Sequence, residues 1–397
     1  MKVLFVTGFT PAKENIRGVS AHPFFLLKTR PNNIDVSMIT YNINQLSSNY
    51  IHNLQNDLGI HIMVEDIPFS IRIRNNKLGR FFSKRSIYTY INPSKKIQKE
   101  IDSFHPDVIW TYPNFFYRWS DLLNQYKFVH SAPDSNTLSC ARDFIDTICS
   151  KGLIKRIIMN IWYQKSINND KLGDSKNSII HFVGIHDLHM YRKIVKQDNG
   201  FFILHPHYLL KNKRICFSNK LKILVAGNYD QYMKSGIDRI IAIFYNNPYN
   251  LKDKISLAFL GKGWEPIVNQ LLEVEYDCNQ IKWVDNYIDA IIKYDIQLTP
   301  ITIGTGTKGK VLDAIGNGLL CIGTKYALEN IAVRDKESCL LYRDAHEVPA
   351  ILNSIYYHHK KYERMARKGR EQVRKYHAPS RISQRFFGII RQNFHLN

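Results

Sequence analysis

The sequence is poor in cysteine, and its cysteines show no paired spacing. The 397 residues contain no Cys-x-x-Cys pattern, and the six cysteines are scattered: Cys140, Cys149, Cys216, Cys278, Cys321 and Cys339. This distribution argues against a disulfide framework and a zinc site, and favours reduced thiols in a cytosol. We therefore expect a cytoplasmic protein.

Long apolar runs are also absent. No run approaches the ~18 apolar residues of a transmembrane helix. The apolar part of residues 1–8 is too short for a signal peptide and lacks a small-residue cleavage pattern, so it predicts a buried first strand. The 44% of hydrophobic residues is enough for globular cores, and a chain of this length indicates about two domains.

Acidic residues are outnumbered, and the formal net charge is +21. Such a field attracts nucleic acid, anionic lipid surfaces or phosphorylated ligands. Residues 71–85 hold six basic residues, no acidic residue, and interleaved aromatic and aliphatic side chains. This segment suits an anionic membrane surface, with a solvated loop as the alternative. Nucleic acid is not expected, because no recognition helix, zinc finger or RNA-binding signature is present.

Apolar strands alternate with amphipathic helices along the first half of the chain. Strands are expected at 2–7, 34–40, 107–111, 126–131 and 178–183, and helices at 21–28, 94–104 and 151–170. Residues 205–214 follow as a linker, because they are polar and contain a proline.

The same pattern restarts after the linker. Strands are expected at 221–227, 255–260, 296–301 and 319–324, with an apolar stretch at 281–284, and helices at 235–245, 265–273, 287–294, 347–376 and 381–394. The alternation predicts two α/β domains, each with a parallel sheet covered on both faces. Ligands of such folds bind beyond the carboxyl ends of the strands, so the cleft between the domains is the expected site.

A glycine-threonine-lysine turn, residues 304–310, lies between the strand at 296–301 and an apolar helical pattern that begins at Val311. The N–H groups and dipole at a helix N-terminus favour an anion, and glycines allow it to approach closely. Lys308 and Lys310 add positive charge. Many α/β proteins contain such turns without a ligand, so the turn alone is a moderate signal for a phosphate site.

The order and spacing of several short motifs resemble the donor-binding domain of two-domain (GT-B) glycosyltransferases, especially those of family 4. The resemblance covers about 221–376 and rests on residues 223–229, 234–236, 259–263, 283–290, 297–300, 304–314, 323–324 and 364–376. The first half matches only in outline. The family resemblance implies two Rossmann-like domains facing a cleft.

The resemblance also implies a domain division and an activity. Residues 1–208 would form the acceptor-side domain, residues 209–376 the nucleotide-sugar donor domain, and residues 377–397 a helix that returns to the first domain. The implied reaction transfers a sugar from a nucleoside-diphosphate sugar to a glycan or lipid-linked acceptor, with retention, in surface polysaccharide or glycolipid assembly. The positive charge, rather than any motif, suggests that this takes place at or near the inner membrane face. Such enzymes stabilise the leaving diphosphate with protein cations and helix N-termini, so no cofactor and no metal are expected.

The family's phosphate-binding positions fall on residues of the second half. Lys234 and Lys310 match its phosphate-contacting cations, while Gly304, Gly306, Thr307 and Lys308 would surround the diphosphate. Asp313 matches the acid that accepts the ribose hydroxyls, since a carboxylate accepts two hydroxyl groups. A surface role for Lys234 and a helix-capping role for Asp313 remain open.

The sequence departs from the family at three donor-site positions. Thr305 stands where an acid faces the transferred sugar, and Asp313 is one methylene shorter than the usual glutamate. After the strand that ends near Gly227, Asn228 or Tyr229 stands where an arginine is usual. Because of these differences, the sequence does not predict which residues bind the transferred sugar or which sugar it is.

Three residues of the first half complete the expected site. His130 matches a family histidine near the transferred sugar, and a purely structural role is the alternative. Asp134 is a candidate acceptor contact, and Gly18 would let the backbone approach the diphosphate. His205 and His207 have no positional support and are interpreted as linker residues.

Two other functions remain possible from the sequence. One is a nucleotide-sugar 2-epimerase of the same fold, and the other is a non-catalytic sugar- or polyanion-binding protein with a decayed site. The last helix is expected to return to the first domain. Its arginines leave a membrane-surface helix as the alternative.

Overall fold

The computed structural model describes residues 1–13, 19–150, 152–207 and 209–396, without the side chains of residues 146–150. Compact packing divides the chain into two units. The first unit comprises Met1–Pro206 and Pro379–Asn397, and the second unit comprises His207–Ala378.

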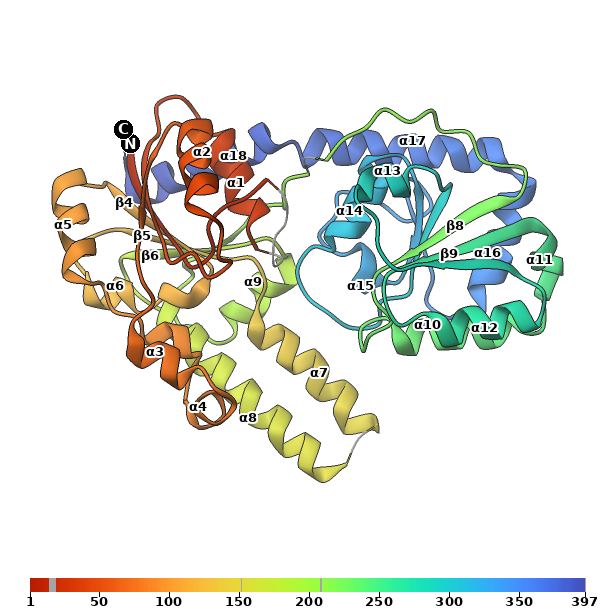
Figure 1. The fold of residues 1–397 in the computed structure, drawn as a ribbon, viewed down its shortest axis with the longest axis horizontal. Helices are drawn as coiled ribbons and strands as arrows, with labels where there is room; N and C mark the ends of the chain where they lie inside the picture. The colour runs from red at the N-terminus through yellow and green to blue at the C-terminus, as the bar shows by residue number, and fades with distance from the viewer. Residues whose placement is uncertain (14–18, 151, 208, 397) are drawn as a thin grey trace. The chain divides into compact units, whose positions relative to one another are not determined.

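The first unit is built on a seven-stranded parallel sheet in the order β3-β2-β1-β4-β5-β6-β7. Figure 1 labels its strands β4, β5 and β6. Its strands are β1 (Lys2–Thr7), β2 (Asp35–Thr40), β3 (His61–Val64), β4 (Val108–Tyr112), β5 (Phe128–Ala132), β6 (Ser178–Phe182) and β7 (Gly200–Phe202). Alternate residues of β1 supply both faces of the sheet, as a period of two requires. Val3 and Phe5 join one apolar cluster, while Leu4 and Val6 join another.

Helices cover both faces of this sheet. They are α1 (Ala21–Lys28), α2 (Ser48–Leu58), α3 (Phe69–Arg74), α4 (Lys77–Phe82), α5 (Lys95–Phe104), α6 (Trp119–Leu122), α7 (Asn136–Ser150), α8 (Leu153–Asp170), α9 (Ile185–Arg192) and α18 (Pro379–Phe394), with short 3-10 turns η2 (Ile87–Tyr90), η3 (Asn114–Phe116) and η4 (Lys171–Gly173).

The last helix, α18, packs in the first unit, which confirms the expected return. It contacts α1, and Ser383 Oγ donates to Leu26 O over 2.8 Å. The Phe386 ring is buried, with its centroid 4.9 Å from that of Trp110. An aromatic residue at this depth makes α18 part of the core rather than a membrane-surface helix.

The second unit contains a six-stranded parallel sheet in the order β10-β9-β8-β11-β12-β13. Its strands are β8 (Leu221–Ala226), β9 (Ile255–Leu260), β10 (Asp277–Ile281), β11 (Ile296–Thr299), β12 (Leu320–Gly323) and β13 (Leu340–Leu341). Its helices are α10 (Lys234–Phe244), α11 (Leu251–Lys254), α12 (Glu265–Glu273), α13 (Tyr287–Ile291), α14 (Gly309–Gly316), α15 (Lys325–Leu328), α16 (Glu347–Tyr357) and α17 (His359–Tyr376), with a 3-10 turn η5 (Pro248–Asn250).

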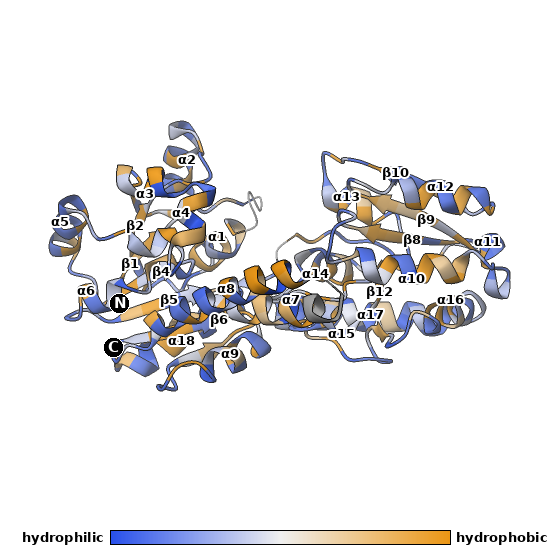
Figure 2. Cartoon of the chain, turned by 90° about the horizontal axis from the view of Figure 1, so that it is seen from below, coloured by the Kyte–Doolittle hydropathy of each residue, from blue (hydrophilic) through white to orange (hydrophobic). Residues whose placement is uncertain are grey.

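Strands and helices of the second unit differ in polarity, as their burial requires. Figure 2 shows β8 and β9 in hydrophobic colours, whereas α10 and α12 carry both colours. Ile223 and Val225 pack on the α10 side, and Leu224 and Ala226 pack with Val311 of α14. The predicted pair of parallel α/β sheets is confirmed.

Several elements differ from the expectation. Residues 71–85 form most of two short helices, α3 and α4, rather than a loop. Of the apolar stretch 281–284 only Ile281 lies in a strand, and Trp283 is exposed. Within the described ranges, no helix is long and apolar enough to cross a bilayer.

Candidate functional site

The loop between β11 and α14 depends on two glycines for its path. Gly304 has φ +135° and Gly306 has φ +64°, conformations that L side chains rarely adopt. Lys308 occupies the N-cap position of α14, and its carbonyl accepts from the N–H groups of Val311 and Leu312. The earliest N–H groups of a helix have no partner within the helix, so the start of α14 can offer donors to an anion.

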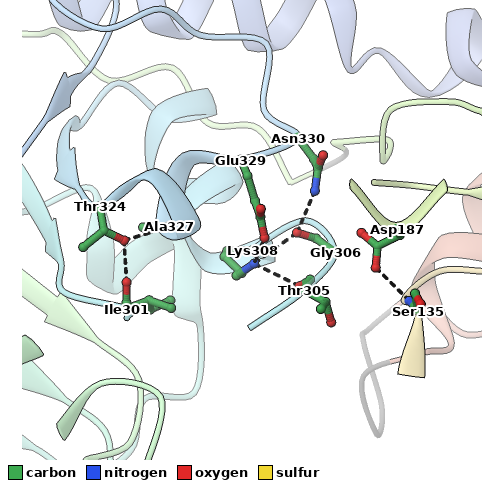
Figure 3. Close-up of polar contacts among 10 residues, drawn as sticks. All are labelled: Ser135, Asp187, Ile301, Thr305, Gly306, Lys308, Thr324, Ala327, Glu329 and Asn330. Atoms are coloured by element: carbon green, nitrogen blue, oxygen red, sulfur yellow. Dashed lines mark hydrogen bonds and ion pairs between the residues drawn. The ribbon is translucent and has the colours of Figure 1, made fainter. Parts of the chain in front are cut away.

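The Lys308 side chain holds this loop from inside. Its Nζ donates to the carbonyls of Thr305 and Gly306 over 2.9 and 3.1 Å, and it lies 3.0 Å from Glu329 Oε1 (Figure 3). The Lys308 and Glu329 side chains are only 13% and 7% exposed. Glu329 therefore compensates the charge that the sequence suggested Lys308 would bring to a ligand.

Two further contacts fix the loop. Asn330 Nδ2 donates to Gly306 O over 3.0 Å (Figure 3). Gly236 of α10 lies so close to the end of β11 that a Cβ there would meet Pro300 O at 2.0 Å. The start of α10 is thereby pressed against the strand that leads into the loop.

Lys310 is the cation of the loop that stays available. Its side chain is exposed and makes no ion pair with any residue in the described part of the chain. Partial desolvation lowers the pKa of Lys310, and the nearby Asp230 and Asp313 oppose that shift. Lys310 is the second residue of α14, so the start of this helix carries a lysine without an ion-pair partner in the described structure.

Asp313, one turn into α14, is held by a histidine from the start of the second unit. The Nε2–H of His207 donates to Asp313 Oδ1 over 3.1 Å, and the two side chains are 2% and 19% exposed. Gly316 makes room for the imidazole, because a Cβ there would lie 2.3 Å from the ring. The carboxylate is thus fixed by one oxygen while remaining partly open to solvent.

Lys234, the other expected cation, is engaged at the surface. Its Nζ donates to Tyr229 Oη over 2.8 Å and lies 3.8 Å from Asp238 Oδ2, with the side chain 59% exposed. The Tyr229 hydroxyl donates to Asp238 Oδ1 over 2.6 Å. The hydrogen bond with Tyr229 raises the pKa of Lys234, and Asp238 adds to the shift.

Gly227 and Asn228 tie two neighbouring loops together. Gly227 has φ +141°, and a Cβ on Gly261 would lie 2.2 Å from Gly227 O. Asn228 Oδ1 accepts from the Lys262 N–H over 3.0 Å. The Asn228 side chain therefore stabilises the β8 and β9 turns.

The candidates of the first unit lie in different surroundings. His130 is the third residue of β5 rather than its end, and its ring is fully buried between Tyr117 and Phe128. Its Nδ1 lies 2.7 Å from Thr111 Oγ1, and burial lowers its pKa to about 3, which keeps the ring neutral. Asp134 is exposed in the turn after β5, and Gly18 lies outside the described residues.

The structure therefore gathers part of the expected set at one place. The loop of residues 304–308, Lys310 and Asp313 lie together at the start of α14, while Lys234 belongs to the start of α10. His207 and Glu329 support this set. The sequence predicts a linker residue at His207, and only the fold brings its ring to Asp313.

Comparison with known proteins agrees with this organisation. Residues 247–388 match the family model described as "Glycosyl transferase-like". No curated protein matches the sequence.

Solved structures share the fold over nearly the whole chain. HepE of Anabaena in complex with UDP superposes with a TM-score of 0.65 at 10% identity, covering 99% of this chain and 100% of HepE. The lipopolysaccharide outer core galactosyltransferase WaaB gives 0.65 at 11% identity, with 99% and 100% covered. Sucrose-phosphate synthase of Thermosynechococcus elongatus gives 0.63 at 11%, with 99% of both chains covered.

These likenesses confirm the GT-B fold that the sequence resemblance implied. Within this fold, residues 247–388 are similar to the glycosyl transferase-like family.

Proposed function

We propose that the protein transfers a sugar from a nucleoside-diphosphate sugar to a glycan or lipid-linked acceptor, with retention of configuration. The observation that carries the proposal is the combination of a glycine loop, a helix start, a lysine without an ion-pair partner in the described structure and a held carboxylate in the second unit. The similar HepE structures contain UDP or UDP-glucose, and WaaB is a galactosyltransferase, which supports the same ligand class here.

The diphosphate would bind at the start of α14. When the bond between the anomeric carbon and the β-phosphate oxygen breaks, negative charge develops on the leaving diphosphate. Lys310 and the N–H groups at Gly306, Thr307 and Lys308 would stabilise that charge. The charge of Lys308 is already compensated by Glu329, so its side chain would not serve the diphosphate directly. Its role would be to hold the loop through the carbonyls of Thr305 and Gly306.

Asp313 would accept a ribose hydroxyl of the nucleotide. His207 holds Oδ1, which leaves Oδ2 of Asp313 for the ligand. The shorter side chain of aspartate is then offset by a fixed orientation. Asp134 remains the proposed acceptor contact, and Gly18, Gly227, Asn228 and Thr305 remain proposed members of the donor side.

His130 and Lys234 take supporting roles in this proposal. His130 is neutral and buried, so it would order β4 and β5 beneath the acceptor-side turn that carries Asp134. Lys234 shares its charge with Asp238, and it would reach a phosphate only if that contact opened.

We also propose that the first unit works at an anionic membrane surface, where surface glycans and glycolipids are assembled. Basic residues of α3 and α4 stand beside exposed apolar side chains such as Phe69 and Phe82. A surface that combines cations and apolar side chains binds anionic bilayers. The wild-type chain should co-sediment with vesicles that contain phosphatidylglycerol, whereas the variant with Arg72, Arg74 and Lys84 changed to Gln should stay in the supernatant. Equal co-sedimentation of the two chains would remove this segment from the proposal.

Calorimetric titration with UDP and UDP-glucose tests the donor site. Lys310→Met and Asp313→Asn should each weaken binding by roughly ten- to a hundredfold, since a hydrogen bond to a charged group contributes about 1.5–3 kcal/mol. Lys293→Met, an exposed lysine near the end of α13, is the matched control and should bind as wild type. Unchanged affinity in both site variants would place the nucleotide elsewhere.

A further inference from the structure

A pocket separate from the donor site lies wholly within the first unit. It has a volume of about 440 Å³ and is formed by α4, the residues around η2, α7 and α8. This space is large enough for a phosphorylated sugar, because ligand pockets commonly measure about 300–1,000 Å³. No part of the donor site described above lines it.

Three cations surround this pocket. Arg80, Arg85 and Lys165 line it, and none of them makes an ion pair with another residue in the described ranges. Lys165 Nζ donates to the carbonyl of Arg80 over 2.9 Å and to that of Phe81, which joins α8 to α4. Desolvation lowers the pKa of Lys165. Uncompensated positive charge beside a partly desolvated pocket favours an anionic ligand.

A buried acceptor atom lines the same pocket. Asn169 is 3% exposed, and its Oδ1 has no hydrogen-bond partner in the described structure. A buried carbonyl without a partner is costly, and an anion would make the cost larger because it offers no donor. This atom therefore calls for a donor such as a hydroxyl group, so the ligand must carry hydroxyls as well as negative charge.

Aromatic rings provide a further wall. The Tyr88 and Phe115 rings stack at 4.7 Å, and the Tyr88 hydroxyl accepts from Asn75 Nδ2 over 3.0 Å. Lys165 Nζ lies 4.9 Å from the ring centroid of Trp162. Rigid aromatic faces combined with amide and hydroxyl groups suit a sugar ring, which has apolar C–H faces and polar edges.

An exposed apolar surface adjoins the pocket on α4 and α8. Helix α4 shows both hydrophobic and hydrophilic colours in Figure 2. The exposed apolar side chains nearest the pocket are Leu78 and Phe82 of α4 and Trp162 of α8, and α8 carries further exposed apolar side chains toward its start, at Leu153, Ile154 and Ile157. Exposed apolar groups in such number indicate a binding surface for an apolar partner.

We propose that this pocket binds the headgroup of a lipid-linked acceptor in which a phosphate joins the sugar to a hydrocarbon chain. The phosphate lies among Arg80, Arg85 and Lys165, and a sugar hydroxyl donates to Asn169 Oδ1. The hydrocarbon follows the apolar side chains of α4 and α8. The identification of this ligand as the acceptor rests on the transferase function proposed above.

Three amphiphiles at concentrations below micelle formation test the ligand chemistry on the full chain: glucosyl phosphoryl dodecanol, dodecyl phosphate and dodecyl glucoside. Binding is followed by calorimetry. The wild type should bind glucosyl phosphoryl dodecanol at least tenfold more tightly than either of the others, because only that probe has both the phosphate and the sugar. Equal affinity for all three would overturn the proposal, since it would mean that hydrocarbon alone is bound.

Variants separate the two parts of the pocket. Arg85→Gln should lower the affinity for both phosphorylated probes by about tenfold and leave the affinity for dodecyl glucoside unchanged. Asn169→Leu should remove the preference for glucosyl phosphoryl dodecanol over dodecyl phosphate. Lys176→Gln, an exposed lysine of the first unit, is the control and should bind as wild type. Wild-type binding by a thermally stable Arg85→Gln chain would overturn the proposal.

Competition with a second monomeric anionic lipid distinguishes this site from general attraction to anionic lipid. Dihexanoyl phosphatidylglycerol, kept below micelle formation, should not displace glucosyl phosphoryl dodecanol at equal phosphate concentration, and full displacement would contradict a selective pocket. UDP binding is measured on the same variants and should be unchanged. Probe binding without UDP binding would support the pocket and sink the transferase proposal, whereas UDP binding without probe binding would do the reverse.

Discussion

His207 donates from Nε2 to Asp313 Oδ1 over 3.1 Å, although 106 residues separate them in the chain. The contact joins the first residue of the second unit to the helix that follows the glycine loop. It fixes one carboxylate oxygen of Asp313 and leaves the other for a ligand. His207 is therefore a positioning residue of the proposed donor site.

Replacing His207 should separate its hydrogen bond from its bulk. His207→Phe removes the donor, so the KM for the donor sugar should rise roughly tenfold while kcat changes little, as expected for the loss of about one hydrogen bond of binding energy. His207→Gln retains an N–H donor and should restore most of the affinity. A loss that is equal in both variants would show that His207 acts only by filling space.

The Lys308–Glu329 pair should contribute to stability rather than to nucleotide affinity. Lys308→Met removes the cation that lies 3.0 Å from the buried Glu329 carboxylate, which should lower the unfolding free energy by about 3 kcal/mol. Lys308→Met combined with Glu329→Leu should recover a large part of that loss. Lys310→Met, two positions away, should keep the stability and lose UDP affinity; urea unfolding and titration measure both quantities.

Equal destabilisation by Lys308→Met and by the double variant would contradict a coupled pair. The cycle is informative because the two side chains contact each other directly, so their effects should not add.

Asp170 should make the first unit less stable as the pH rises. Burial raises the pKa of its carboxyl to about 7, with Asp187 adding to the rise and the Thr137 hydrogen bond opposing it. The folded state thus binds a proton that the unfolded state has lost above about pH 4, so the stabilisation is present at low pH and disappears as the pH approaches 7. From pH 4 to pH 7, the unfolding free energy of the wild type should fall relative to that of Asp170→Asn by on the order of 4 kcal/mol.

Urea unfolding of the two chains at pH 4.5, 5.5, 6.5 and 7.5 measures this difference. A constant difference across the series would mean that Asp170 ionises in the fold as it does in the unfolded chain.

His181 should act in the opposite direction. Burial, with the charge of His205 adding, lowers its pKa to about 3, although a hydrogen bond with the Ile203 backbone opposes the shift. The folded state therefore binds fewer protons than the unfolded state below pH 6.5, so the stabilisation is present above that pH and is lost as the pH falls. Between pH 7 and pH 5, the unfolding free energy of the wild type should fall by about 2 kcal/mol more than that of His181→Gln. Parallel pH profiles would contradict a neutral buried His181.

Much of the fold could be predicted because its signals are local. In the expected helix at 94–104, Ser94 precedes an amphipathic pattern and is a residue type that caps helices, and its Oγ accepts from the Ile97 N–H at the start of α5. The expected helix at 265–273 coincides with α12. The two-residue strand β13 and the short helices α3 and α4 lack enough residues to show a period, so their pattern gave no signal.

The candidate site was predictable only where it depends on neighbouring residues. The glycine loop and the start of α14 follow from the local sequence, since the special backbone angles need glycine. Lys308 and Glu329 are 21 residues apart, and their contact arises only when the fold brings them together. His130 could not be placed from its sequence neighbours, because burial within β5 depends on the strands and rings packed around it.

The donor site is tested by measuring the release of nucleoside diphosphate from a panel of nucleoside-diphosphate sugars by the purified protein. We expect that at least one donor is cleaved, that acceptor lipid accelerates the release, and that Lys310→Met does not release nucleoside diphosphate. An intact nucleotide carrying an epimerised sugar would indicate the epimerase reaction instead. If the protein neither binds nor cleaves any donor, the assignment of the loop after β11 as a nucleotide-sugar site is contradicted.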